Sequence, residues 1–320
     1  MPLSFDMPLE ELRTYEGSNP RPSDFDEYWD QALKEMRAID PQIELVPADF
    51  NTDYAECYHL YFNGVRGARI HARFLRPRKA EQPHPAVLMF HGYSMNSGDW
   101  LSKLPYVAQG YSVAALDSRG QGGLSQDTGG TTGWTLRGQI VRGLDDTPEN
   151  MLFRHIFLDT AQLANIVMDM PEVDASRVGA TGGSQGGGLS LVCAALEPCI
   201  KRLAPTFPFL CDYKRVWDLD LGERAYEELK VWFRRFDPRH LREDEVFEKL
   251  GYIDVQFLCP RIKGEVLLAV GLMDQVCPPS TQFAAYNKIT SEKSLMTYPD
   301  FGHEELPYRA EEIFRFMGGL

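Results

Sequence analysis

Short, largely apolar runs alternate with longer amphipathic segments along this chain, and this alternation restricts the fold more than any other feature. Apolar runs of strand length are typical of a parallel sheet that is buried on both faces. They are AVLMF (86–90), SVAAL (112–116), RVGAT (177–181) and EVLLAVG (265–271). Segments with helical spacing lie between and after them, at about 158–170, 186–197, 280–289 and 308–317. The pattern predicts an α/β fold whose mostly parallel central sheet is flanked by helices.

The remaining segments are expected to join the same single domain, residues 1–320, with an N-terminal extension at about 1–50. Three further elements are expected, namely a helix at 25–38 and an antiparallel pair of strands at 56–63 and 69–75. A densely charged segment at 212–256 has Trp, Phe and Tyr at helical spacing, which predicts a helical insertion that caps the strand ends. Core packing explains its aromatic stripe more simply than substrate contact does.

The charge balance of the chain limits its partners. The 320 residues include 33 Lys and Arg against 46 Asp and Glu, which gives a net charge of −13 at pH 7. Such a surface repels phosphate backbones and anionic membranes, so neither nucleic acid nor membrane is expected as a partner. The start MPLSFDMPLEELRTYEG has no basic region followed by an apolar run, and no segment approaches the ~20 apolar residues of a membrane span. We therefore expect a cytoplasmic protein.

The cysteines and histidines give no sign of a bound metal. The six cysteines are scattered without a C-x-x-C pair, which predicts free thiols in a reducing compartment. None of the seven histidines has zinc-ligand spacing with another histidine or with a cysteine. Neither a metal nor a cofactor is expected.

One stretch, RVGATGGSQGGGLS (177–190), places six glycines around Ser184. It follows a strand candidate and enters the helix-compatible run GGGLSLVCAALE, and Gly182, Ser184 and Gly186 form the pattern G-x-S-x-G. A phosphate-binding loop would carry a Lys beside its Ser or Thr, and none is present. The pattern instead favours a sharp strand-to-helix turn that exposes the Ser184 hydroxyl as a nucleophile.

A serine nucleophile needs a base and an acid, and on this kind of turn they follow it in the order acid, then histidine. Asp274 comes just after the apolar run 265–271, and His303 follows a strand candidate at 293–298. His240 is the other histidine after the serine, but it lies in the charged insertion. Asp300 is too near His303 in sequence to approach from a separate strand end. The order and placement therefore favour Ser184, Asp274 and His303 as a catalytic triad.

Acyl transfer also builds negative charge on the carbonyl oxygen, which backbone N–H groups must stabilise. One such donor is expected to be the residue after the nucleophile, Gln185. The second is expected in the loop after an early strand, where His91-Gly92-Tyr93 provides the N–H of Tyr93.

Three groups of residues together resemble a known family. DSRGQGG with Arg119 and Gln121, GGSQGG around Ser184, and HE with His303 occur in this order, and the likeness extends through PLEELRTY, FHGY, PEVDASRVG, PPSTQFAAYN and FGHE. The chain is similar to carbohydrate esterase family seven, the acetyl xylan esterases and cephalosporin C deacetylases of the α/β-hydrolase superfamily.

This resemblance implies an α/β-hydrolase fold and an esterase that removes acetyl groups from small acetylated substrates through an acyl-enzyme. Acetylated xylo-oligosaccharides and cephalosporin C-like acetates are the substrates it suggests. It also implies that Ser184, Asp274 and His303 form the triad, that Tyr93 and Gln185 supply the oxyanion donors, and that the protein is a homohexamer whose active sites face an internal cavity.

The chain departs from the family at one point. Its sequence TFPFL has Phe207 and Phe209 where relatives typically have tyrosines, which leaves the acyl and alcohol preference open. Arg119 and Gln121 are interpreted as scaffold that braces the loops around the site. A simple exposed position is the alternative for the arginine.

Other functions use the same residues. A peptidase or a lactone hydrolase could work with the same triad, and a hydrolase-like binding module would show no turnover. A thiol enzyme based on Cys277 is a further alternative, although a lone cysteine followed by two prolines is more often structural.

Overall fold

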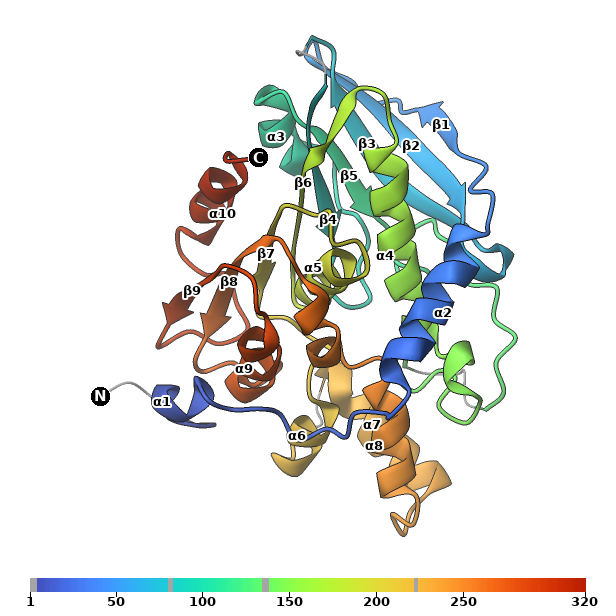
Figure 1. Ribbon diagram of the computed structural model, residues 1–320, viewed down its shortest axis with the longest axis vertical. Helices are drawn as coiled ribbons and strands as arrows, with labels where there is room; N and C mark the ends of the chain where they lie inside the picture. Colours follow the sequence, from blue (N-terminus) through green and yellow to red (C-terminus); the bar gives the residue numbers. More distant parts are fainter. Residues whose placement is uncertain (1–4, 80–82, 134–137, 222–223) are drawn as a thin grey trace.

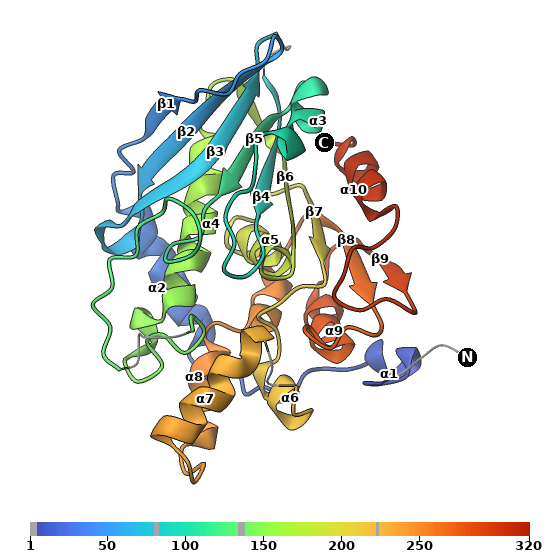
Figure 2. The same cartoon turned by 180° about the vertical axis from the view of Figure 1, so that it is seen from behind.

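The computed structural model describes residues 5–79, 83–133, 138–221 and 224–320, and one nine-stranded sheet runs through it (Figures 1 and 2). The strands are β1 (Glu44–Pro47), β2 (Ala55–Asn63), β3 (Arg69–Pro77), β4 (His84–Phe90), β5 (Ser112–Leu116), β6 (Val173–Gly183), β7 (Arg202–Thr206), β8 (Glu265–Gly271) and β9 (Lys293–Tyr298). Their order in the sheet is β1-β2-β3-β5-β4-β6-β7-β8-β9. The pairs from β5 to β9 are parallel, and β1, β2 and β3 add an antiparallel edge. The predicted mostly parallel α/β sheet is confirmed.

Helices cover both faces of this sheet. They are α1 (Leu9–Leu12), α2 (Phe25–Arg37), α3 (Leu104–Ala108), α4 (Leu152–Met168), α5 (Gln185–Leu196), α6 (Tyr213–Asp218), α7 (Glu227–Phe236), α8 (Glu243–Gly251), α9 (Pro279–Lys288) and α10 (Arg309–Met317). Helices α4 and α5 pack on one face against β6, while α3 and α10 lie on the other face against β5 and β7 (Figure 1). The wholly buried side chains of β5 reflect this double cover, as parallel strands require.

The sequence prediction missed one central strand and misplaced the start of one helix. Strand β7 contains Pro205, and proline argues against a central strand because it cannot donate to the ladder. Helix α4 starts at Leu152, six residues before the predicted 158. Its first turns bury Arg154 and His155, and buried polar side chains hide the apolar periodicity that marks a helix.

The charged segment 212–256 forms helices α6, α7 and α8, as predicted, and they gather at the lower end of the molecule in Figure 1. Residues 222–223 of this insertion, like residues 1–4 of the extension, lie outside the described part. The aromatic stripe is packed inside, since Trp232 and Phe233 are fully buried and the Trp217 ring lies 4.7 Å from that of Phe233. Packing is therefore the role of these aromatic side chains.

All six cysteines are free, and five of them are buried. Among the described residues, no helix is both long enough and apolar enough to cross a bilayer.

Candidate active site

Ser184 occupies the sharp turn between β6 and α5. Its backbone has φ 58° and ψ −121°, a conformation that costs energy for a residue with a side chain. The Ser184 N–H donates to the Thr206 carbonyl at 3.0 Å, and its carbonyl accepts the N–H of Gly188 at 3.1 Å. Strand β7 and helix α5 thus hold the strained residue in place, with its side chain outside both elements.

The two glycines of the G-x-S-x-G pattern are required by close backbone contact. A Cβ at Gly186 would lie 2.0 Å from the Phe90 carbonyl oxygen, and one at Gly182 would lie 2.5 Å from the same atom. At Gly183 the nearest atom would be an ordinary 3.5 Å away, on the Phe207 ring. The crossing of β6 and α5 beside the end of β4 therefore excludes any side chain at positions 182 and 186.

His303 and Asp274 form a hydrogen-bonded pair at the ends of β9 and β8. The Nδ1 of His303 lies 2.8 Å from Oδ2 of Asp274. Asp274 is fully buried, and its Oδ1 accepts the N–H groups of Val276 and Cys277, each at 2.8 Å. A carboxylate held in this way can orient the imidazole and fix its tautomer, with the proton on Nδ1. The other ring nitrogen, Nε2, can then act as the base.

Backbone contacts bring the two loops of this pair together. The Met273 N–H donates to the Phe301 carbonyl at 2.9 Å, and a Cβ at Gly271 would lie 2.5 Å from that same oxygen. Glu304, the second residue of the HE pair, accepts the Gly302 N–H at 3.0 Å, so this hydrogen bond spans His303.

The buried thiol of Cys277 lies beside both the nucleophile candidate, Ser184, and the His303–Asp274 pair. The thiol of Cys277 interacts with the Ser184 side chain. Its sulfur, a ring nitrogen of His303 and a carboxylate oxygen of Asp274 all lie within 4.8 Å of one another. The structure thus gathers all three predicted triad residues around one buried thiol.

The same thiol is poorly suited to be a nucleophile. Cys277 is completely buried, and burial raises the pKa of its thiol well above the usual value. The reactive form of cysteine is the thiolate, which burial disfavours. Asp274, Cys277 and His303 also lie close enough together to be considered as metal ligands. Because Asp274 and His303 are hydrogen-bonded to each other, we interpret the group as an acid–base pair beside a thiol.

The two alternative triad members lie in other surroundings. Asp300 is exposed at the turn after β9. His240 is exposed between α7 and α8, where its ring contacts Trp217 and Phe233 and its Nδ1 lies 3.4 Å from Glu243.

The two oxyanion candidates are joined by the side chain of Gln121. Its Oε1 accepts the N–H of Ser94, the residue after Tyr93, at 2.9 Å. Its amide also exchanges hydrogen bonds with the Gln185 side chain at 2.8 and 3.1 Å. Gln121 therefore links the loop after β4 to the start of α5, in agreement with the scaffold role predicted for it.

His91 fixes the same loop from its other end. Its Nδ1 donates to the Gly92 carbonyl at 2.8 Å, and its Nε2 accepts the Ser118 N–H at 3.0 Å. Burial lowers the pKa of His91, so the neutral ring that this pattern requires is favoured.

Arg119 is buried, so the alternative interpretation of it as a simple exposed arginine is wrong. It forms a two-pronged ion pair with Asp159 on α4, with N–O distances of 2.7 and 2.6 Å, and donates to the Val65 carbonyl at 3.1 Å. Arg119 is 1% exposed and Asp159 is fully buried. The pair attaches the loop after β5 to α4, so the scaffold interpretation of the arginine is confirmed.

The two phenylalanines that depart from the family pattern occupy different positions. The Phe207 ring lies 4.3 Å from the His303 ring, so it borders the candidate base. Phe209 is fully buried, and its ring lies 5.5 Å from that of Tyr93 and 4.4 Å from that of Tyr226.

Sequence reasoning missed two residues that touch the site. Glu228, on α7, accepts a hydrogen bond from the Tyr93 hydroxyl, and Cys277 was considered only as an alternative nucleophile. No motif includes Glu228, because it lies in the charged insertion among many similar residues.

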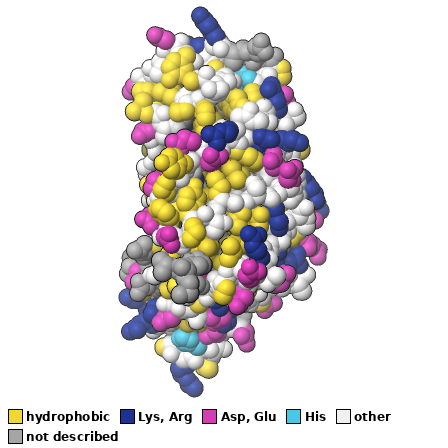
Figure 3. Space-filling model, turned by 90° about the vertical axis from the view of Figure 1, so that its left-hand side faces the viewer, with side chains coloured by type: hydrophobic (Ala, Val, Ile, Leu, Met, Phe, Trp, Pro, Cys, Tyr) yellow, Lys and Arg dark blue, Asp and Glu magenta, His cyan; other side chains and the backbone are white. Residues whose placement is uncertain are grey.

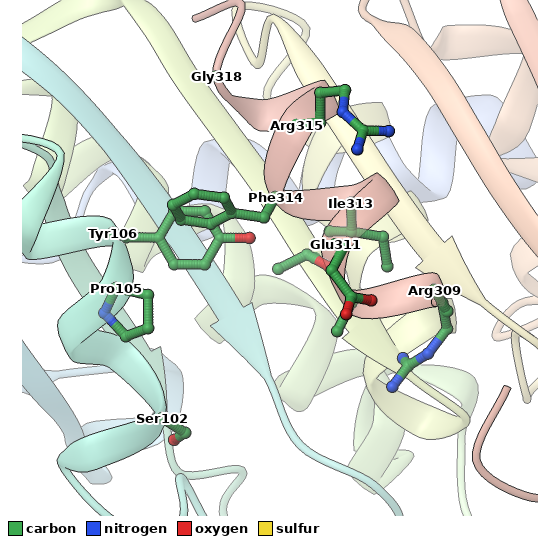
Figure 4. Close-up of a pocket in the computed structure, with 11 residues that line it drawn as sticks. Ser102, Pro105, Tyr106, Arg309, Glu311, Ile313, Phe314, Arg315 and Gly318 are labelled. Atoms are coloured by element: carbon green, nitrogen blue, oxygen red, sulfur yellow. The ribbon is translucent and has the colours of Figure 1, made fainter. Parts of the chain in front are cut away.

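A separate cavity of about 810 Å³ lies between α3 and α10 (Figure 4). Its lining includes Tyr106 and Phe314, whose rings are 5.0 Å apart, together with Arg309 and Glu311. None of the predicted triad or oxyanion residues lines it. This cavity is therefore distinct from the candidate active site.

Comparisons with known proteins identify the family to which this chain belongs. A family model described as acetyl xylan esterase (AXE1) matches residues 1–320. The crystal structure of acetyl xylan esterase 1 from Thermoanaerobacterium sp. JW/SL YS485 is 64% identical, with a TM-score of 0.97 over 98% of this chain and 99% of that one. The acetyl xylan esterase from Paenibacillus sp. R4 is 35% identical, with a TM-score of 0.93 over the same shares.

A curated relative, acetyl esterase Axe7A from Xylanibacter ruminicola, is 28% identical over 284 residues. The match covers 87% of this chain but 62% of the relative, so this chain spans less than two thirds of that longer protein. The family model matches the whole chain, and the two similar solved structures each cover 98% of it. The chain therefore belongs to the acetyl xylan esterase family, a family of carboxylic ester hydrolases with the α/β-hydrolase fold.

Proposed function

We propose that this protein is a serine esterase that removes acetyl groups from small acetylated carbohydrates. The observation that carries the proposal is the 2.8 Å bond between His303 and Asp274, placed with Cys277 beside the strained turn of Ser184. Membership of the acetyl xylan esterase family supports the acetyl group and the carbohydrate.

In the proposed mechanism, neutral His303 takes the proton of the Ser184 hydroxyl through Nε2 while the serine oxygen attacks the acetyl carbonyl. The tetrahedral intermediate collapses as His303 returns this proton to the departing sugar oxygen, which leaves an acetyl-serine. A water molecule then loses a proton to His303 and attacks the acyl group, and acetate and free Ser184 result. Asp274 holds the ring and stabilises its positive charge.

The N–H groups of Tyr93 and Gln185 are the proposed donors to the oxyanion. Among the described residues, neither N–H has a hydrogen-bond acceptor. One such donor typically contributes ~3 kcal/mol to transition-state stabilisation.

Three more specific proposals concern further substrates, the cellular location and the oligomeric state. Cephalosporin C-like acetates are proposed as further substrates. A cytoplasmic location is supported by the free cysteines. A homohexamer is proposed from the resemblance, and the hydrophobic side chains that gather on the face carrying α10 and β9 support self-association (Figure 3).

The test compares acetylated xylo-oligosaccharides and p-nitrophenyl acetate with the butyrate and octanoate esters, a peptide substrate and a lactone. We expect acetyl compounds to have the highest kcat/KM, and S184A to lose on the order of 10⁶ in kcat with an unchanged fold. Faster cleavage of the peptide or the lactone would contradict the substrate class. Activity retained in S184A would contradict the nucleophile.

A further inference from the structure

Tyr93, which carries one proposed oxyanion donor, is tied by its side chain to the helical insertion. Its hydroxyl donates a hydrogen bond to Oε1 of Glu228, which lies in the second position of α7. Glu228 is 5% exposed, so this bond is shielded from water. The insertion thus reaches the loop that follows β4.

The second oxygen of Glu228 holds another loop. Its Oε2 accepts the N–H of Gln139 at 2.6 Å and that of Val141 at 3.0 Å. Gly138 has φ +85°, and a Cβ there would lie 2.4 Å from the same oxygen. The chain at 138–141 therefore wraps closely around the carboxyl group. Burial raises the pKa of Glu228 to about 7, and the hydrogen bonds from Tyr93 and this loop act in the opposite direction.

The other side of the Tyr93 ring contacts the support of the nucleophile. The Phe209 ring meets it edge-on, at 5.5 Å and 72°. The Phe209 N–H donates to the Ser184 carbonyl at 3.0 Å. Tyr93 is therefore held at its hydroxyl by Glu228 and at its ring by Phe209, whose backbone is hydrogen-bonded to Ser184.

We propose that Glu228 is a positioning residue for ester hydrolysis, because it anchors the Tyr93 side chain and thereby aims the Tyr93 N–H at the developing oxyanion. This inference rests on the proposed function, since it requires that N–H to be an oxyanion donor. Such donors act within about 2.7–3.1 Å of the oxyanion. A misplacement of about 1 Å can cost on the order of 10² in rate. Because the contact matters most in the transition state, its loss lowers kcat and leaves KM nearly unchanged.

Three variants separate this role from simple packing. Glu228→Ala removes both anchors, and we expect kcat to fall at least about tenfold. Glu228→Gln keeps an oxygen for the two N–H groups and an amide for the Tyr93 oxygen, so kcat should stay within about threefold of the wild type. Tyr93→Phe leaves Glu228 bound to the loop at 138–141 and removes only the phenol bond, and we expect a loss of about fivefold or more. In each case KM for p-nitrophenyl acetate should change by less than about twofold.

The double variant E228A/Y93F should be no slower than E228A, because both changes break the same link. Glu248→Gln, an exposed site on α8, is the matched control and should behave as the wild type in kcat and melting temperature. If E228A does not fold, Y93F and E228Q decide the question. A folded Y93F with wild-type kcat, or losses that appear in KM, would overturn the positioning role while leaving the proposed function intact. A wild-type protein with no acetyl esterase activity would overturn both.

Discussion

At the scale of single residues, the site depends on two glycines, Gly182 and Gly186, because any larger side chain at these positions would displace the backbone. The Phe90 carbonyl oxygen lies where side chains at positions 182 and 186 would be, and this contact allows Ser184 to stand at the crossing of β6 and α5. The glycines therefore matter for their small size as well as for chain flexibility.

Gly186→Ala should accordingly destabilise the fold by ~3 kcal/mol or more, because its Cβ would lie 2.0 Å from the Phe90 carbonyl oxygen and the backbone would have to shift to admit it. Gly183→Ala is the matched control, since its Cβ would meet only an ordinary 3.5 Å contact. Urea unfolding of both variants measures the difference. Equal stability of the two would show that the crossing is looser than described.

His155 gives a residue-scale prediction for the pH dependence of stability. Burial and the nearby Arg119, Arg66 and Arg154 lower its pKa to about 3, while the unfolded chain has an ordinary histidine. Below pH 6.5 the unfolded state binds the extra proton, so the free energy of unfolding decreases as the pH falls. Between pH 7.5 and 5.0 this one group should remove about 2 kcal/mol.

His155→Gln should lack that contribution. The check is urea unfolding of both proteins at the two pH values. The wild type should lose more stability than the variant on acidification, and an equal loss would mean that His155 is protonated in the folded state.

At the scale of elements, the sequence predicted those whose apolar pattern is regular. The strands at 86–90, 112–116 and 265–271 appear as expected, because parallel strands that are buried on both faces need continuous apolar runs. Strand β7 could not be found in this way, since Pro205 masks it. The pairing of Asp274 with His303 follows from strand order, whereas the contact of Glu228 with Tyr93 depends on where α7 packs. Local sequence carries no signal for that packing.

The ion pair of Arg119 and Asp159 tests how elements are joined, because it links the loop after β5 to α4. Arg119→Met should cost about 3–5 kcal/mol of stability, since it leaves the Asp159 carboxylate buried and unpaired. The double variant R119M/D159L removes both charges and should recover much of that loss. Urea unfolding distinguishes the two. A double variant that is less stable than R119M would show that the pair itself is strongly favourable.

At the scale of the whole molecule, helices cover both faces of the sheet while one side of the molecule keeps hydrophobic side chains in view (Figure 3). We predict that the protein assembles through such surfaces into a hexamer of the 36.3 kDa chain. Light scattering coupled to gel filtration measures the mass directly. A mass equal to a single chain at micromolar concentration would exclude the assembly and the enclosed cavity that it implies.

The central claim is that Ser184 is activated by His303 and Asp274. The most direct measurement is intact mass and peptide mapping after reaction with diethyl p-nitrophenyl phosphate, which phosphorylates activated serines. The account predicts one diethylphosphoryl group per chain, located on Ser184, with parallel loss of esterase activity and no adduct in S184A. An adduct on another residue, or an unlabelled protein that still hydrolyses acetyl esters, would contradict it.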